Sequence, residues 1–242
     1  MTAPIVREHG GVWVVRDDLF PGGTKARFMP VLFEGVEEAV YASPAEGGAQ
    51  TALATVAKDF GKRATIFVAA RAKLHLRTLE AARLGAKVVP VRPGYLSVVQ
   101  ARAKDYAKTS GARLVPFGVD LPEAITRLAD AALATGLDPD EVWCAAGSGV
   151  LARALANAWP RARRHVVQVG RELEAKDVAN ATIHVYPRPF SYVAKAISPF
   201  PSDPHYDAKA WETMTARKGP GRVVFWNVAG PACLRLTFER IE

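Results

Sequence analysis

Short apolar runs rich in β-branched and aromatic residues recur along the chain, and segments with apolar residues at helical spacing separate them. Runs of this kind predict buried strands. The predicted strands cover residues 12–15, 39–43, 65–69, 87–91, 113–115, 141–145, 165–169 and 222–226. Apolar residues three and four positions apart predict amphipathic helices between the strands. These helices cover residues 49–60, 97–109, 122–134 and 150–158, and one more carries Leu74, Leu79, Ala82 and Leu84.

This alternation of strand and helix, from residue 39 to residue 169, determines the predicted fold class. It predicts an α/β protein with a parallel sheet that is covered by helices on both faces. Beyond Gly170 the alternation weakens, and residues 186–206 contain five prolines, which predicts loop there. A chain of 242 residues is long enough for one α/β domain or for two small lobes.

Composition adds constraints on partners and compartment. The net charge is +8, which favours an anionic partner such as nucleic acid, or an anionic cofactor and substrate. Cys144 and Cys233 form no CxxC pair, which argues against a disulfide scaffold or a metal site and fits a reducing compartment. No apolar run approaches the ~20 residues of a membrane span, and the N-terminus lacks a signal-peptide core. We therefore expect a cytoplasmic protein with no membrane partner.

A glycine pair presents a lysine shortly after the first predicted strand. The segment Gly22-Gly23-Thr24-Lys25 follows the charged triplet Arg16-Asp17-Asp18. Two glycines allow a tight turn, and the lysine then stands where a helix can begin. Taken alone, such a lysine is more often a solvated loop residue. The whole pattern, however, resembles the cofactor-lysine segment of fold-type II pyridoxal-phosphate enzymes. It looks most like the branch of aminocyclopropane-carboxylate deaminase and D-cysteine desulfhydrase. The resemblance implies that Lys25 carries pyridoxal 5'-phosphate as a Schiff base.

A second glycine-rich turn, Gly147-Ser148-Gly149, lies between a predicted strand and a predicted helix. Unpaired amides and the positive end of the helix favour an anion there, although such a turn is also common without a ligand. The segment resembles the family's phosphate-binding loop, which implies that Gly147, Ser148 and Gly149 bind the cofactor. It is shorter than the usual Gly-Ser-Gly-Gly-Thr form.

The segment Glu46-Gly47-Gly48-Ala49-Gln50 resembles the family's loop for the substrate carboxylate. Gly47, Gly48, Ala49 and Gln50 are therefore expected to bind substrate. The usual form has serine and asparagine where this chain has Gly47 and Gly48. The absence of the serine and the asparagine removes a side chain that reaches the cofactor's ring hydroxyl in the family. It also opens room for a bulkier substrate. Glu46 is either a base or substrate-orienting group, or an exposed loop glutamate.

Two later segments match the same family. Asp203-Pro204-His205-Tyr206 is similar to a segment whose tyrosine faces the substrate. Tyr206 is therefore a candidate proton donor or acceptor, or else a tyrosine packed at a helix start.

Asn227 stands near the place where the family has a threonine or serine that bonds the pyridine nitrogen. An amide partner does not hold that nitrogen protonated, so the ring would be a weaker electron sink.

The resemblance spans residues 16 to 232 and carries expectations for the whole molecule. It implies two parallel α/β lobes, a larger one from about 1–38 plus 112–242 and a smaller one from about 39–111. It also implies a homodimer and a lyase that acts at the α-carbon of an amino acid by elimination with deamination or by decarboxylation. Deamination or desulfhydration of a free small amino acid, and racemisation, remain open.

The positive charge suggests a further hypothesis. Two basic clusters could bind a phosphodiester backbone: Arg71, Lys73 and Arg77, and Arg161, Arg163 and Arg164. The substrate would then be an amino acid already attached to a nucleobase, as in bacteriophage DNA hypermodification. A non-catalytic alternative is a basic α/β nucleic-acid-binding protein that lost its cofactor. The departures at Gly47, Gly48 and Asn227 keep that alternative open.

Overall fold

The computed structural model describes residues 2–232, which form two compact units. The first unit combines the residues up to Glu34 with Pro116–Pro231, and the second unit consists of Gly35–Val115. Each unit has its own mainly parallel β-sheet with helices packed on it. The predicted α/β class with helix-covered parallel sheets is confirmed.

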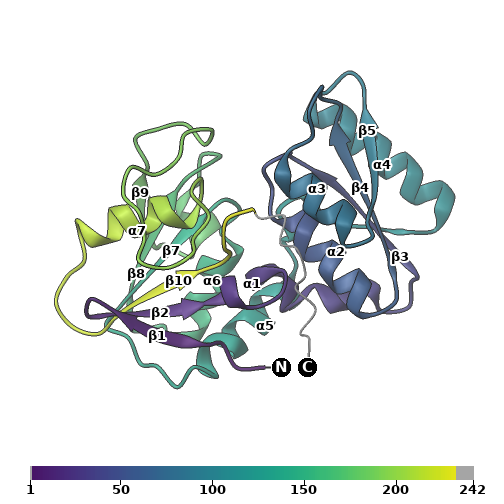
Figure 1. Cartoon of the computed structure of the whole chain (residues 1–242). Coiled ribbons are helices and arrows are strands. Elements are labelled where there is room, and N and C mark those ends of the chain that lie inside the picture. The colour runs from purple at the N-terminus through teal and green to yellow at the C-terminus, as the bar shows by residue number, and fades with distance from the viewer. Residues whose placement is uncertain (1, 233–242) are drawn as a thin grey trace, which may run out of the picture. The chain divides into compact units, whose positions relative to one another are not determined.

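The first unit contains a six-stranded sheet in the order β1-β2-β10-β7-β8-β9. Its strands are β1 (Val6–His9), β2 (Val12–Arg16), β7 (Glu141–Ala146), β8 (Arg163–Gln168), β9 (Thr182–Val185) and β10 (Val223–Asn227). β1 pairs antiparallel with β2, and every other neighbouring pair is parallel. In Figure 1, β2 in purple therefore lies beside β10 in yellow, although the two are far apart in the sequence.

Helices cover both faces of this sheet (Figure 1). α5 (Pro122–Leu133) and α6 (Val150–Ala158) pack together on one face, and α7 (Asp207–Thr215) lies on the other. Large apolar side chains fill the space under α7, including Trp143, Trp211, Met214 and Phe225. Burying one such side chain contributes about 1.5–3 kcal/mol, so this core firmly supports β7 and β10. Short helices complete the unit: α1 (Gly23–Ala26), η1 (Asp17–Leu19), η2 (Met29–Phe33), η3 (Phe117–Val119) and η4 (Ala175–Val178).

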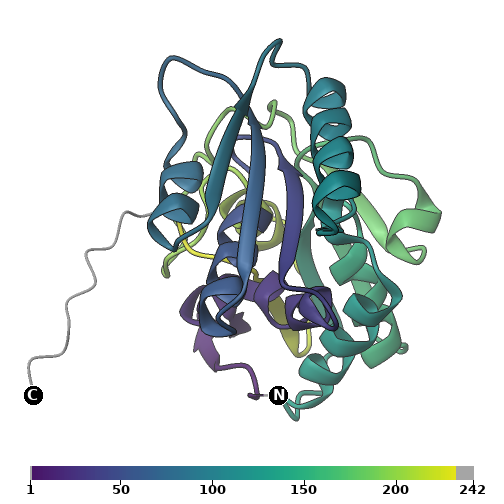
Figure 2. The same ribbon diagram turned by 90° about the vertical axis from the view of Figure 1, so that its right-hand side faces the viewer.

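The second unit contains a four-stranded parallel sheet in the order β5-β4-β3-β6. Its strands are β3 (Glu38–Ser43), β4 (Arg63–Ala69), β5 (Lys87–Val91) and β6 (Arg113–Leu114). Its helices are α2 (Ala49–Asp59), α3 (Leu76–Arg83) and α4 (Leu96–Ser110). α2 and α3 pack on each other at one face, while α4 covers the other (Figures 1 and 2).

Four local features differ from the sequence prediction. A hairpin, β1 and β2, replaces a single N-terminal strand, because Gly10 and Gly11 adopt the positive φ that a two-residue turn needs. β9 is an additional edge strand beyond Gly170. α3 begins at Leu76, after Leu74, because the His75 ring accepts a hydrogen bond from Arg77 N and caps the helix there. α4 begins at Leu96, one residue before the predicted start at residue 97. Within residues 2–232, no helix combines the length and apolar character needed to cross a membrane.

Two histidines on neighbouring strands stack near Trp143 in the first unit. The His165 ring lies 4.3 Å and the His184 ring 4.7 Å from the Trp143 ring, between centroids. His165 Nδ1 is 3.1 Å from His184 Nε2, so one ring nitrogen must donate and the other accept. Burial is the largest effect on both rings and lowers the pKa of His165 and of His184 below the ordinary value of 6.5. The fold therefore favours the neutral pair.

We expect the free energy of unfolding to fall as the pH drops below about 6.5. Below that pH the histidines of the unfolded chain bind protons, whereas the folded pair stays neutral because its pKa values are lower. The stability that the neutral pair contributes above pH 6.5 is therefore lost as the pH falls through the pKa values of the folded state. The measurement is urea unfolding between pH 8 and pH 5. Replacing both residues, His165→Gln with His184→Gln, should flatten this acid limb. An equally steep limb in the double variant would show that other groups cause it.

Candidate active site

Three neighbouring parallel strands of the first unit end at the same sheet edge. β10 lies between β2 and β7, with Asn227 beside Arg16 and Trp226 beside Cys144. Beyond these ends, β2 leads to the Lys25 turn, β10 leads to Val228, and β7 leads to the loop 147–149. The carboxyl edge of such a sheet is the usual place for a ligand. The fold thus brings Lys25 and the loop 147–149 to one edge.

The Lys25 turn is packed directly against the end of β10. Gly22 and Gly23 have φ values of 78° and 70°, in the left-handed region that favours glycine. A Cβ atom at Gly23 would lie 2.5 Å from the Val228 carbonyl oxygen, and Thr24 N donates to that same oxygen at 2.9 Å. This close approach requires glycine at position 23. The contact with Val228 holds the turn, and with it the half-buried Lys25, at the sheet edge.

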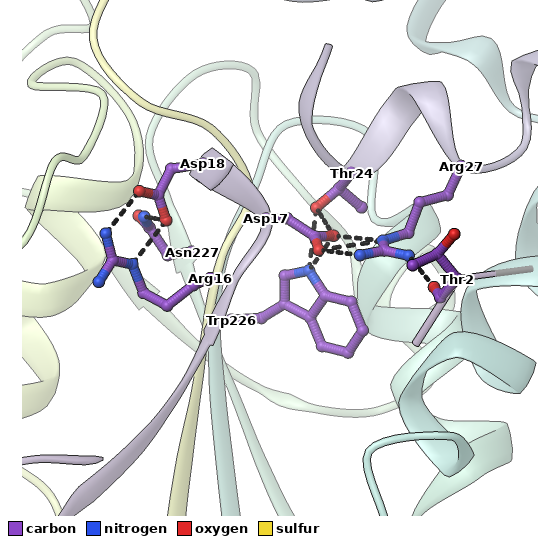
Figure 3. A network of polar contacts seen from close by, with 8 residues as sticks. All are labelled: Thr2, Arg16, Asp17, Asp18, Thr24, Arg27, Trp226 and Asn227. Atoms are coloured by element: carbon purple, nitrogen blue, oxygen red, sulfur yellow. Dashed lines mark hydrogen bonds and ion pairs between the residues drawn. The ribbon is translucent and has the colours of Figure 1, made fainter. Parts of the chain in front are cut away.

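A buried carboxylate, that of Asp17, fastens the Lys25 turn to the sheet (Figure 3). Arg27 donates to it through Nη2 at 2.6 Å and through Nε at 3.0 Å. The Thr24 hydroxyl donates to it at 2.7 Å and Trp226 Nε1 at 3.2 Å. Residues on both sides of Lys25 and one residue of β10 therefore share a single buried partner.

A second network uses the whole amide group of Asn227, and Figure 3 shows its contact with Asp18. Asn227 Nδ2 donates to Asp18 Oδ1 at 2.7 Å and to the Pro201 carbonyl at 2.9 Å, and its Oδ1 accepts from the Ser202 hydroxyl at 2.7 Å. Asn227 is fully buried. Neither of its N–H groups is left for a cofactor, so the expected contact of Asn227 with a ring nitrogen is not supported. The side chain instead braces the turn after β10.

Asp207, at the start of α7, is a candidate site residue that the sequence analysis did not identify. Its side chain is fully buried; Oδ2 accepts from Ala229 N at 3.3 Å, and Oδ1 has no partner among residues 2–232. Burial, and then the charge of Asp203, raise the pKa of Asp207 well above its usual range. Burial lowers the pKa of Lys25, and the nearby Asp207 carboxylate partly opposes that change. Asp207 follows Tyr206 directly, at a position that the family pattern leaves unspecified.

Tyr206, the residue before Asp207, contacts the loop 147–149. A Cβ atom at Gly147 would lie 3.3 Å from the Tyr206 hydroxyl, so the tyrosine lies against this loop. Burial, followed by the Asp207 charge, raises the pKa of Tyr206, while a hydrogen bond from the Gly147 backbone acts in the opposite direction. Tyr206 is therefore neutral at ordinary pH and can donate a proton. Lys25, Asp207, Tyr206 and Gly147 form one cluster in the first unit.

The loop 147–149 fits an anion. Gly149 has a φ of 85°, and a Cβ atom there would lie 2.0 Å from the Asp177 carbonyl oxygen, so the position requires glycine. No side chain caps the start of α6, so its first N–H groups have no side-chain acceptor. Free amides at the positive end of a helix bind phosphate well.

The predicted substrate loop lies in the second unit, between β3 and α2. Glu46 is half-buried and pairs with Arg71 at 3.8 Å. Gln50 is fully buried, and its Nε2 donates to the carbonyls of Pro44, Ala45 and Gly47 at 3.3, 2.9 and 3.1 Å. The amide nitrogen of Gln50 thus shapes the loop.

The expected extra room in this loop is present at one of its two glycines. A Cβ atom at Gly47 would lie 3.2 Å from Pro44, whereas one at Gly48 would meet nothing within 4 Å. Gly47 is therefore packed tightly, and the expectation of room there is wrong. Only Gly48 is open, and Ala49 beside it is buried at the start of α2.

Comparisons with known proteins agree with these features. Residues 2–224 match the model of a family described as "Pyridoxal-phosphate dependent enzyme", and no curated protein matches the chain. A structure of an ACC deaminase homologue shares 18% identity and a TM-score of 0.79, over 95% of this chain and 90% of that one. Maize serine racemase shares 13% identity and a TM-score of 0.72, over 94% and 88%. A threonine deaminase from T.th. shares 17% identity and a TM-score of 0.66, over 90% and 87%. At these identities the neighbours show the fold.

Proposed function

Because the chain belongs to the pyridoxal-phosphate dependent enzyme family, we propose that it is a lyase acting at the α-carbon of an amino acid. The predicted cofactor, pyridoxal 5'-phosphate, is confirmed by the family. The observation that carries the proposal is the fully buried Asp207 carboxyl group, whose Oδ1 has no hydrogen-bond partner among residues 2–232 and whose charge acts on the pKa of Lys25. A buried carboxyl oxygen without a hydrogen-bond partner has an acceptor site to offer to a ligand group.

The residues at the sheet edge fit the cofactor. Lys25 Nζ would hold it covalently, the N–H groups at the start of α6 would bind its phosphate, and Asp207 would hold its ring nitrogen. When bound, the cofactor supplies an electron sink for the charge that develops at the α-carbon of the substrate. Since the fold favours the neutral carboxyl group, Asp207 would bring a proton that it could share with the ring nitrogen, which an amide such as that of Asn227 could not do.

The chain's own groups would move the protons. Burial lowers the pKa of Lys25, so a free Lys25 amine is neutral more often than an exposed one and can accept a proton from the α-carbon. Burial raises the pKa of Tyr206, so its hydroxyl keeps a proton that it can give to a leaving group. A role of Glu46 as base stays a prediction, because Glu46 belongs to the second unit.

Replacing Asp207 tests the proposed site without removing the lysine. We expect Asp207→Asn to lower turnover by about 10²- to 10⁴-fold and to shift the visible absorbance of the bound cofactor. Stability should be kept, because the fold already disfavours the charged form of this carboxyl group. The matched control is Asp130→Asn, an exposed aspartate on α5. Unchanged absorbance and turnover would remove Asp207 from the site.

A substrate screen would identify the reaction. The structural neighbours include a threonine deaminase, a diaminopropionate ammonia lyase and a serine racemase. The panel is D- and L-amino acids together with aminocyclopropane-carboxylate. Release of ammonia and a 2-oxo acid supports a lyase, whereas change of enantiomer alone indicates a racemase. No reaction of any compound by cofactor-loaded protein would contradict the lyase proposal for free amino acids.

An amino acid linked to a nucleobase remains a second candidate substrate, based on the net charge of +8. Arg77 is buried, and Arg163 and Arg164 donate to Glu141 and to the Pro160 carbonyl, so the basic clusters have fewer free cations than the sequence suggests. Retention on DNA that ends at moderate salt would support this candidate, and no binding at low salt would exclude it. A homodimer also stays a prediction, which sedimentation would test.

A further inference from the structure

A hollow next to the loop 147–149 contains none of the side chains to which a role has been given so far. Residues 168–170, at the end of β8, and residues 185–190, at the end of β9, line an open hollow with a volume of about 380 Å³. Gln168 lies beside Ala146 in the sheet, and Val169 N donates to the Ala146 carbonyl at 3.4 Å. Neighbouring strands are about 4.8 Å apart, so the hollow begins one strand away from Gly147.

The outer wall of the hollow is attached to the helix that follows Tyr206. Lys209 Nζ, on α7, donates to the carbonyls of Pro189 and Phe190 at 3.1 and 3.2 Å. His205 Nδ1 lies 3.1 Å from the same Phe190 carbonyl. Phe190 and Tyr206 also pack against the same apolar core. A group bound in the hollow would therefore be held in a fixed position relative to Tyr206.

The groups around the hollow favour a negative charge. Arg188 is exposed, no carboxylate among residues 2–232 pairs with it, and its guanidinium lies 5.9 Å from the Tyr192 ring. The Gln168 Oε1 atom already accepts from Leu173 N at 2.8 Å, so Gln168 has N–H donors left to offer. Glu212 is the opposing charge: its Oε1 accepts from the Tyr186 hydroxyl at 3.3 Å, and its Oε2 accepts from Lys195 N and Ala196 N at 2.7 and 2.9 Å, so both oxygens already have donors.

We propose that this hollow binds an anionic end group, carboxylate or phosphate, on the side chain of the amino-acid substrate. The inference rests on the proposed function. Arg188 would be the specificity-determining residue, because a guanidinium pairs with either anion through two parallel hydrogen bonds. The enzyme would then favour an acidic amino acid over the neutral one of similar shape.

Two matched substrate pairs test this proposal: glutamate with glutamine, and O-phosphoserine with serine, each as both enantiomers. The measured quantity is the ratio of kcat/KM within a pair. We expect a preference of about 10- to 100-fold for the acidic member of at least one pair, and its loss in Arg188→Gln. Arg161→Gln removes the same charge from another exposed position and should keep the preference. The pair that responds shows whether carboxylate or phosphate is bound.

Failure of this inference and failure of the proposed function give different results. If pyridoxal 5'-phosphate binds and Arg188→Gln keeps the wild-type ratio, or wild type shows no acidic preference, the hollow does not select an anion and the lyase proposal stands. If the cofactor does not bind, the proposed function fails, and calorimetric titration with O-phosphoserine and glutarate decides about the hollow. Binding of either compound about tenfold weaker in Arg188→Gln than in Arg161→Gln supports the anion site, and equal binding overturns it.

Discussion

Lys25→Ala protein, mixed with pyridoxal 5'-phosphate, lacks the visible absorbance band of lysine-bound cofactor and turns over substrate at least about 10⁴-fold more slowly than wild type. Both losses follow from one amine, which would carry the cofactor and shuttle the α-proton. Fold stability should change little, because the Lys25 side chain is half-buried and its burial disfavours the charged amine.

Absorbance spectra and steady-state turnover measure this effect, with Lys176→Ala as the control. Lys176 is an exposed lysine of the same unit, and it pairs with the exposed Glu174. The control variant should keep both the band and the turnover. A Lys25→Ala protein that keeps the band would show that another amine carries the cofactor.

Asp17→Ala lowers the free energy of unfolding by about 3–5 kcal/mol. The substitution leaves the Arg27 guanidinium, whose side chain is 2% exposed, without its charged partner. It also removes the acceptor of the Thr24 hydroxyl, on the turn that carries Lys25. We therefore expect weaker cofactor binding together with the loss of stability.

Urea unfolding of the cofactor-free protein isolates the structural part of this effect. The matched control is Asp120→Ala, because Asp120 pairs with Arg153 at 2.6 Å but its side chain is 45% exposed. An exposed pair of this kind contributes about 0–1 kcal/mol. Equal losses in the two variants would mean that the buried network does not anchor the Lys25 turn.

Strand and helix periodicity was enough to predict a parallel, helix-covered α/β structure, because parallel strands buried on both faces appear as uninterrupted apolar runs. The expectation of two lobes came from the family resemblance. The periodicity did not predict a strand of which only a small part is buried. β9 is a four-residue edge strand that includes exposed Thr182 and Val185, so its pattern resembles loop. The start of α3 was also missed, because the His75 ring caps that helix and histidine is not a usual cap.

The site was partly predictable for a topological reason. Lys25 and the loop 147–149 follow parallel strands of one sheet, and β10 lies between these two strands, so the two segments meet at one edge. Asp207 was missed because its importance comes from full burial and an unpartnered oxygen, which a sequence does not display. The hydrogen bonds of Asn227 could not be predicted, because its partner Asp18 is 209 positions away in the chain.

Reduction of cofactor-loaded protein with borohydride, followed by peptide mass mapping, tests the central claim most directly. The reduced cofactor should be found on the peptide that contains Lys25, and Lys25→Ala protein should yield no modified peptide. Cofactor attached instead to the buried Lys209, or to no lysine at all, would contradict the assignment of Lys25 as the residue on which the chemistry depends.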